Sequence, residues 1–338
     1  MPVEFDDFAK RRRLALKSGL AACFMVPGIR GAWAKHSRGG HAGTSRSERF
    51  LIGRDPATIP PPPAGGADQR TIDVPDGRIS YLDTGGTGEV IVLLHATTGT
   101  ARSWDYQLPA LKAAGYRAIA IWRRGTPESA SGRAPTNTLE TRDLLAFADG
   151  LGLRQFHLLG TASGGFIAIR FAVAHEARLY SLTLANSLLG LNQPEFAEKL
   201  DTLLPDGFQA MPSEFKELSA SYRMANPEGV KRWLEIEAGS VAAILQQRPD
   251  MAARMRAGVR GSDGPDYTTL QTLNLPVHLI YGDADLYAPP ALARILAAQF
   301  RQVTLSILGE SGHASHWEQP ENFNTGILSF LSLARSRT

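Results

Sequence analysis

The chain has 338 residues, of which 43% are hydrophobic and 20% are charged, and it contains one cysteine. This composition is typical of a folded globular protein and excludes a disordered, collagen-like or disulfide-stabilised chain. The excess of 36 Lys and Arg over 33 Asp and Glu gives a net charge of +3, and the pI is near 9.0. No stretch reaches the ~18 uncharged apolar residues that a membrane-spanning helix needs.

The first 34 residues carry the features of an export signal in the expected order. A basic cluster contains the pair Arg12-Arg13, an apolar run follows over residues 19–29, and Ala32-Trp33-Ala34 is a small-residue cleavage site. The segment resembles a bacterial twin-arginine signal peptide, which implies a periplasmic or secreted protein. A basic amphipathic helix is the alternative interpretation of the same residues.

A second processing site overlaps this signal. Residues 20–23, Leu-Ala-Ala-Cys, resemble a lipoprotein box, which would anchor the chain through Cys23. The apolar run continues past Cys23, so cleavage after Ala34 is the favoured prediction. The first 34 residues hold six basic and three acidic residues, which leaves 30 of each sign in residues 35–338. The mature protein is therefore expected to be neutral, without a membrane span and without the overall positive charge that favours nucleic-acid binding.

Residues 35–69 are predicted to form a tether between the signal and the folded domain. The segment is rich in His, Gly, Ser and Arg and ends in four consecutive prolines, Pro60 to Pro63, followed by Gly65-Gly66. Polyproline and glycine stretches favour an extended connection over a core element. Part of this tether is expected to wrap the surface of the domain.

From residue 70 onward, the pattern predicts alternating strands and helices. Residues 70–74 and 78–83 alternate in polarity around Pro75-Asp76-Gly77, which predicts a β-hairpin. Residues 89–95 are a continuous apolar run, typical of a strand buried on both faces. Further strands are expected at 117–122, 156–160, 181–185, 277–281 and 303–308, and helices at 104–114, 139–151, 165–174, 290–300 and 320–334. This alternation predicts an α/β fold with a doubly wound, mostly parallel sheet.

An insertion over residues 188–270 separates two of the predicted strands. Its periodicity is helical, with candidate helices at 194–204, 212–222, 229–247 and 249–257. Because it connects two sheet strands, we expect it to lie over the carboxyl edge of the sheet, where such folds bind ligands. The insertion is therefore interpreted as a helical cap, or lid.

Short motifs follow the predicted strands in a characteristic order. They are His95-Ala96-Thr97-Thr98, Trp122-Arg123-Arg124-Gly125, Gly160-Thr161-Ala162-Ser163-Gly164-Gly165, Gly282-Asp283-Ala284-Asp285 and Gly309-Glu310-Ser311-Gly312-His313. With these motifs, the chain from about residue 70 to the C-terminus resembles an α/β-hydrolase with a helical cap. The resemblance implies a core of residues 70–187 and 271–338, and a cofactor-independent hydrolase.

The resemblance implies a general base and its orienting carboxylate near the C-terminus. His313 follows the last strand in a glycine-flanked turn, at the position of the family's catalytic histidine. Asp285 lies three residues after Gly282, at the position of the carboxylate that holds the histidine. His316 and Asp283 are the alternatives, and both are disfavoured by their offset from the motif.

The chain departs from the family at the nucleophile elbow, Gly-x-Ser-x-Gly. Gly160 and Gly164 flank Ala162, and alanine has no oxygen with which to form an acyl-enzyme. One interpretation is a water molecule activated by the histidine, as in the aminoacrylate hydrolases that the chain resembles in this alanine. A second is Ser163 as nucleophile in a shifted elbow, which Thr161 would crowd. A third is an engineered Ser→Ala replacement.

The resemblance also implies an oxyanion hole made of backbone N–H groups. Ser163 is expected to contribute one of them, and Thr97 or its neighbour Ala96 the other. His95 is expected to be structural, and Trp122, which replaces the family's aspartate, either packs the loop or shapes the pocket.

In the cap, Tyr222, Arg223 and Trp233 are candidate substrate contacts, and Arg223 would suit a substrate that bears a carboxylate. No phosphate-binding loop and no metal-ligand cluster is evident, so neither cofactor nor metal is expected. The predicted function is hydrolysis of an ester, lactone, amide or activated C–C bond in a small organic molecule. The alternatives are a non-catalytic binding module and a lyase that uses the same histidine and aspartate.

Overall fold

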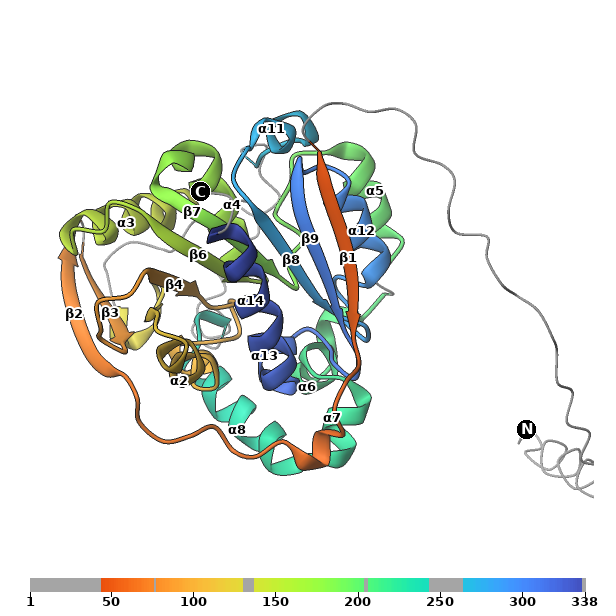
Figure 1. Ribbon diagram of the computed structural model, residues 1–338. Coiled ribbons are helices and arrows are strands. Elements are labelled where there is room, and N and C mark those ends of the chain that lie inside the picture. Colours follow the sequence, from red (N-terminus) through yellow and green to blue (C-terminus); the bar gives the residue numbers. More distant parts are fainter. Residues whose placement is uncertain (1–43, 76, 130–136, 204–205, 243–263, 336–338) are drawn as a thin grey trace, which may run out of the picture. The chain divides into compact units, whose positions relative to one another are not determined.

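A nine-stranded sheet organises the described part of the chain (Figure 1). The computed structural model describes residues 44–75, 77–129, 137–203, 206–242 and 264–335. The strands are β1 (Ser45–Leu51), β2 (Asp68–Val74), β3 (Gly77–Asp83), β4 (Val90–Leu94), β5 (Arg117–Ile121), β6 (Phe156–Thr161), β7 (Leu179–Ala185), β8 (Val277–Gly282) and β9 (Gln302–Leu308). Their order is β1-β9-β8-β7-β6-β4-β5-β3-β2, and only the β2–β3 and β3–β5 pairs are antiparallel. The predicted α/β fold with a mostly parallel sheet is confirmed.

Helices cover both faces of this sheet. One face packs against α3 (Asn137–Gly150), α4 (Ser163–His175) and α12 (Pro290–Ala297), and the other against α2 (Gln107–Ala113) and α14 (Pro320–Arg335). Strand β4 has apolar side chains on both faces. Val92 and Leu94 belong to the first core, whereas Ile91 and Leu93 belong to the second. Successive side chains of a strand point to opposite faces, so a continuous apolar run requires a cover on both sides.

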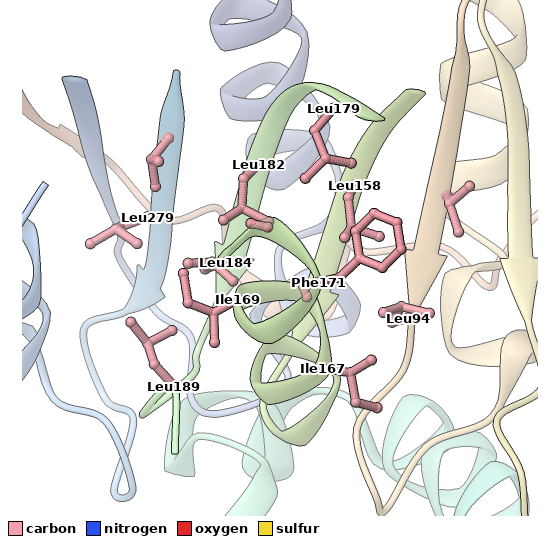
Figure 2. Close-up of a cluster of buried hydrophobic side chains, with 14 of the residues drawn as sticks. Leu94, Leu158, Ile167, Ile169, Phe171, Leu179, Leu182, Leu184, Leu189 and Leu279 are labelled. Carbon is pink, nitrogen blue, oxygen red and sulfur yellow. The ribbon is translucent and has the colours of Figure 1, made fainter. Parts of the chain in front are cut away.

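Helix α4 is central to the first core. Figure 2 shows Ile169 and Phe171 of α4 among leucines that come from four neighbouring strands, Leu94, Leu158, Leu182 and Leu279. The helix has few polar residues along its buried length, so its position is set by apolar contact with the sheet. This packing holds the start of α4 at the carboxyl edge of the sheet, where β4 and β6 end.

The tether prediction is wrong for part of residues 35–69. Strand β1 pairs with β9 in parallel along its whole length, from Ser45 opposite Gln302 to Leu51 opposite Leu308. Its sequence, Ser-Arg-Ser-Glu-Arg-Phe-Leu, is polar and mostly exposed. A strand at the edge of a sheet is held by backbone hydrogen bonds and needs no apolar side chains, so the composition contained no sign of it.

The proline-rich segment also contacts the domain. Pro56–Thr58 form a short 3₁₀ helix, and the side-chain amide of Asn226 donates to the carbonyl oxygens of Pro56 and Ile59 at 3.1 and 3.3 Å. The hydroxyl of Tyr106 donates to the carbonyl of Pro60 at 2.6 Å. These bonds attach residues 56–60 to the surface of the domain, as expected for the part of the tether that wraps it.

The described part of residues 188–270 is helical. It contains α5 (Pro194–Asp201), α6 (Ser213–Glu217), α7 (Ala220–Ala225), α8 (Pro227–Ala238) and α11 (Tyr267–Thr272), and the candidate helix 249–257 lies outside the described residues. The predicted helix 212–222 is divided into α6 and α7, because the Ser219 hydroxyl accepts from the Tyr222 amide and begins a new helix. Contacts from Glu217 and Ala242 reach the loops after β4 and β9, at the carboxyl edge of the sheet.

Hydropathy gives no sign of a membrane helix in the described residues, where no helix is both long and apolar enough to cross a bilayer.

Buried His278 makes the stability of the fold depend on pH. It lies on β8, its Nε2 is 2.9 Å from the Ser306 hydroxyl, and its ring stacks on Phe330 of α14. Burial, together with the charge of Arg49, lowers its pKa to about 3. The unfolded chain, with an ordinary histidine pKa of about 6.5, therefore binds a proton between pH 6.5 and 3 that the folded chain excludes.

We expect His278→Gln to reduce the loss of stability in acid. For the wild type, this histidine lowers the free energy of unfolding by up to about 1.4 kcal/mol per pH unit below pH 6.5. Glutamine can keep a hydrogen bond to Ser306 but does not titrate, so the variant should lose less between pH 6.5 and 5. Urea unfolding at both pH values measures this difference. Equal losses in the two proteins would contradict the prediction.

Candidate active site

A buried histidine–aspartate pair lies at the carboxyl edge of the sheet. The Nδ1 of His313, in the turn after β9, is 2.9 and 3.0 Å from the two carboxylate oxygens of Asp285, in the turn after β8. The Asp285 carboxylate also accepts from the Asn186 side chain at 2.9 Å and from the amides of Tyr287 and Ala288 at 2.8 and 3.0 Å. These bonds fix the carboxylate and leave Nε2 as the histidine nitrogen that can serve the site.

Charge and burial oppose one another in this pair. Burial disfavours the imidazolium, but the charge and hydrogen bond of Asp285, with Glu217 and Glu318, outweigh it and raise the pKa of His313 to about 9. Burial likewise disfavours the carboxylate, and His313 together with the hydrogen bonds lowers the pKa of Asp285 below its usual range. Asp285 therefore strengthens the histidine as a base.

Asp283 and His316, the alternative carboxylate and the alternative base, take no part in this pair. Asp283 accepts from the Ser311 amide at 3.3 Å, which stabilises the neighbouring turn. His316 is buried beside Trp104, with ring centroids 4.7 Å apart, and burial lowers its pKa to about 3. Within the described residues, neither ring nitrogen of His316 has a hydrogen-bond partner, so it serves as an apolar core residue.

Ala162 stands in the strained turn between β6 and α4. Its φ of 49° and ψ of −118° are unfavourable for a residue with a side chain, at a cost of about 1–3 kcal/mol. The turn is tight because a Cβ on Gly160 would overlap the carbonyl of Gly164, and one on Gly164 would overlap the carbonyl of Leu94. This strained turn between a strand and a helix is the backbone conformation expected of a nucleophile elbow, and its central residue is Ala162.

A cavity of about 210 Å³ lies over this turn. Ala162 and His313 both line it, together with Ala96, Thr97, Thr98, Ser163, Phe166, Asn186, Leu188, Glu217 and Tyr287. The space is large enough for a water molecule and part of a small organic molecule.

The hydroxyl of Ser163 is engaged away from His313. It lies 2.6 Å from the Thr97 hydroxyl and accepts from Arg123 Nη1 at 2.9 Å. Arg123 is buried, pairs with Glu140 at 2.7 Å, and donates to the His95 carbonyl at 2.8 Å. No hydrogen bond joins Ser163 to His313 in the described structure, which disfavours Ser163 as a nucleophile because its base would be missing.

Backbone N–H groups are available beside Ala162. Across the described residues, the amides of Thr97 and Ser163 donate no hydrogen bond, whereas the carbonyls of Ala96 and Thr97 accept from Gly99 and Ala242. Ser163 begins α4, where the helix leaves N–H groups unpaired. These amides lie where the sequence predicted an oxyanion hole.

His95, which was expected to be structural, and Trp122, whose role was open, both have structural positions. The Nδ1 of His95 is 2.7 Å from the Ala96 carbonyl, and its Nε2 accepts from the Arg123 amide at 3.0 Å. Burial and the Arg123 charge lower its pKa to about 3, so it is neutral and structural. Trp122 is buried in the second core, away from the cavity.

The cap contributes different residues to the cavity from those predicted. Tyr222 and Trp233 are fully buried in an apolar cluster, and the Arg223 guanidinium stacks 3.8 Å over the ring of Phe215. None of the three is among the residues that line the cavity, which corrects their expected role as substrate contacts. Tyr222 of α7 and Trp233 of α8 therefore serve in packing.

Sequence reasoning missed two charged residues of this region, Glu217 and Arg123. Glu217 lines the cavity from the end of α6, and no motif marks it. Arg123 belongs to the Trp-Arg-Arg-Gly motif, whose two adjacent arginines after an apolar strand were the available signal. As for metals, the described residues contain no group of three or more His, Cys, Asp or Glu arranged to hold an ion.

Residues 91–325 match the family model described as the alpha/beta hydrolase family. A 2-hydroxy-6-oxononadienedioate/2-hydroxy-6-oxononatrienedioate hydrolase from Burkholderia vietnamiensis is 28% identical over 276 residues, which cover 75% of this chain and 91% of that protein. A hydrolase of the same name from Cupriavidus pinatubonensis is 28% identical over 288 residues, 78% of this chain and 94% of its own.

Solved structures share the fold. A thermophilic esterase from Thermogutta terrifontis superposes with a TM-score of 0.65 at 24% identity, covering 79% of this chain and 99% of its own. An enol-lactonase from Burkholderia xenovorans gives a TM-score of 0.64 at 20% identity, covering 78% and 100%.

We expect Asp285→Asn to lower the pKa of His313 from about 9 to below the ordinary histidine value. Without the carboxylate charge, burial outweighs the remaining effects of Glu217 and Glu318. An NMR titration of the imidazole measures the shift. Asp283→Asn is the matched control, since it removes a carboxylate from the same turn without touching His313. A pKa unchanged in Asp285→Asn would contradict the pairing.

Proposed function

The chain belongs to the alpha/beta hydrolase family, and we propose that it hydrolyses a small carbonyl compound with a water molecule activated by His313 and Asp285. One observation carries the proposal. The elbow turn keeps its strained backbone and lies under a cavity that His313 also lines, but its residue is Ala162. The methyl group leaves the place of the usual hydroxyl open to water.

The proposed reaction begins with a proton transfer to His313. Asp285 holds Nδ1, so Nε2 accepts a proton from the water molecule as its oxygen attacks the carbonyl carbon. The oxygen of the carbonyl becomes negative and is stabilised by the amides of Thr97 and Ser163. Because the pKa of His313 is raised to about 9, its basic form increases with pH, and the rate with 4-nitrophenyl acetate, whose leaving group needs no proton, is expected to rise through the alkaline range.

The substrate proposed is an ester, a lactone, an amide or a compound with an activated C–C bond. The curated relatives are named hydrolases of a dicarboxylate, 2-hydroxy-6-oxononadienedioate. In this chain, the described cavity lining contains Glu217 and neither Lys nor Arg. Because no Lys or Arg of the described lining could pair with two carboxylates, a substrate that lacks them suits this cavity better, and neutral esters are suitable probes.

Fluorophosphonate labelling separates the water mechanism from a serine nucleophile. We expect the wild type to hydrolyse 4-nitrophenyl acetate without being labelled, and His313→Ala to lose about 10²-fold or more in rate. Ala162→Ser should become labelled, since it places a hydroxyl at the elbow.

Mass spectrometry locates the label in this experiment. Modification of wild-type Ser163 would overturn the water mechanism. Hydrolysis that is absent, or equal in the wild type and His313→Ala, would instead favour a binding module.

We also propose that the chain is exported by the twin-arginine route, as its first 34 residues suggest. Replacing Arg12 and Arg13 by lysine should leave uncleaved precursor in the cytoplasm, because the pair is the recognition signal. Arg11→Lys is the matched control, and Cys23→Ser tests the lipoprotein alternative. Cell fractionation with an immunoblot measures the outcome, and export that persists without the pair would reject this route.

A further inference from the structure

A buried carboxyl from the cap faces the same cavity as His313. Glu217 is the last residue of α6 and is 4% exposed. Its Oε2 accepts from the Thr98 hydroxyl at 3.2 Å. For Oε1 the described structure contains no hydrogen-bond partner, although the residue lines the cavity. One oxygen is therefore positioned by the protein, and the other is available to a bound molecule.

Backbone bonds hold this carboxyl close to the histidine turn. The carbonyl of Glu217 accepts from the amide of Ala314, the residue after His313, at 2.9 Å. The side chains of Glu217 and His313 therefore extend from two backbone segments that this hydrogen bond joins. A fixed separation is what acid–base groups acting on one substrate require.

The carboxylate of Glu318 also connects the turn that contains His313 to the chain that follows α6. Glu318 accepts from the amide of Gly312 at 2.9 Å and from the amide of Ser219 at 2.7 Å. The cap residues after Glu217 and the residues before His313 are therefore bonded to one side chain. This arrangement resists movement of α6 away from the cavity.

The surroundings of Glu217 favour its neutral form. Burial raises its pKa, and the negative charges of Glu237 and Asp285 act in the same direction. His313 and the Thr98 hydroxyl oppose this shift but do not reverse it. A carboxyl group whose pKa is raised in this way is better suited to carry a proton and donate it to substrate.

We propose that Glu217 is the catalytic acid of this site, which protonates the leaving group of the substrate. This inference rests on the proposed hydrolysis and specifies its second proton transfer. The water oxygen forms a bond to the carbonyl carbon while its proton passes to His313. The bond to the leaving atom breaks with its electron pair, and Glu217 supplies the proton that this atom requires. Transfer of the proton on His313 to Glu217 through solvent restores both groups.

Dependence on the leaving group tests this role. 4-Nitrophenolate leaves 4-nitrophenyl acetate without a proton, whereas the ethoxide of ethyl acetate needs one. We expect Glu217→Gln to reduce kcat/KM for ethyl acetate by about 10²-fold or more, and for 4-nitrophenyl acetate by about threefold at most. Glu214→Gln, in the same helix but outside the cavity lining, is the matched control and should leave both rates unchanged.

The outcomes separate this inference from the function on which it rests. Equal losses on both esters in Glu217→Gln, with hydrolysis still dependent on His313, would reject the acid role alone and indicate a structural one. Wild-type inactivity on both esters would reject the proposed function and the acid role together.

Infrared spectroscopy supplies a readout that needs no substrate. Burial raises the pKa of Glu318 to about 7, so it also contributes to the protonated-carboxyl C=O absorption at pH 7. Glu217→Gln should remove one component of this absorption, and Glu214→Gln should retain it. The same absorption in all three proteins would show that Glu217 is ionised and would overturn the proposal.

Discussion

The close approach of α4 to the end of β4 is the constraint on which the candidate site depends. It is possible because Gly160 and Gly164 have no Cβ, and it forces Ala162 into a conformation that costs about 1–3 kcal/mol. The surroundings hold that turn: the Ala162 amide donates to the Ala185 carbonyl, and the Ser187 hydroxyl donates to the carbonyl of Ala162. The apolar packing of α4 on the sheet supplies the free energy that maintains the strain.

A buried ion pair extends this constraint to the neighbouring loop. Burying an arginine is unfavourable unless its hydrogen bonds are satisfied. Arg123 meets that condition through Glu140, the His95 carbonyl and the Ser163 hydroxyl. It thereby connects the loop after β4 to the start of α4, the two segments whose amides are proposed to bind the oxyanion. Ser163 acts in this network as a positioning residue.

Loss of one hydroxyl changes the chemistry available to the fold more than its geometry. The histidine–aspartate pair, the turn and the free amides all remain, so a reaction that needs a base but no covalent intermediate is still supported. In the proposed water mechanism no serine carries an acyl group, so attack and departure would occur on one substrate in one cavity. A base from the sheet edge and an acid from the cap would then divide the two proton transfers between His313 and Glu217.

The alternation of strands and helices, the α/β class and the motifs that contain His313, Asp285 and Ala162 can be predicted from the amino-acid sequence. These features are local, since each motif follows its own strand by a fixed number of residues. Contacts between distant parts of the chain place β1 in the sheet, bond Ser163 to Thr97 and Arg123, and bring Glu217 to the cavity instead of Tyr222, Arg223 and Trp233. Backbone pairing leaves no mark on composition, and the contacts of a side chain with residues far along the chain are set by packing that no local motif encodes.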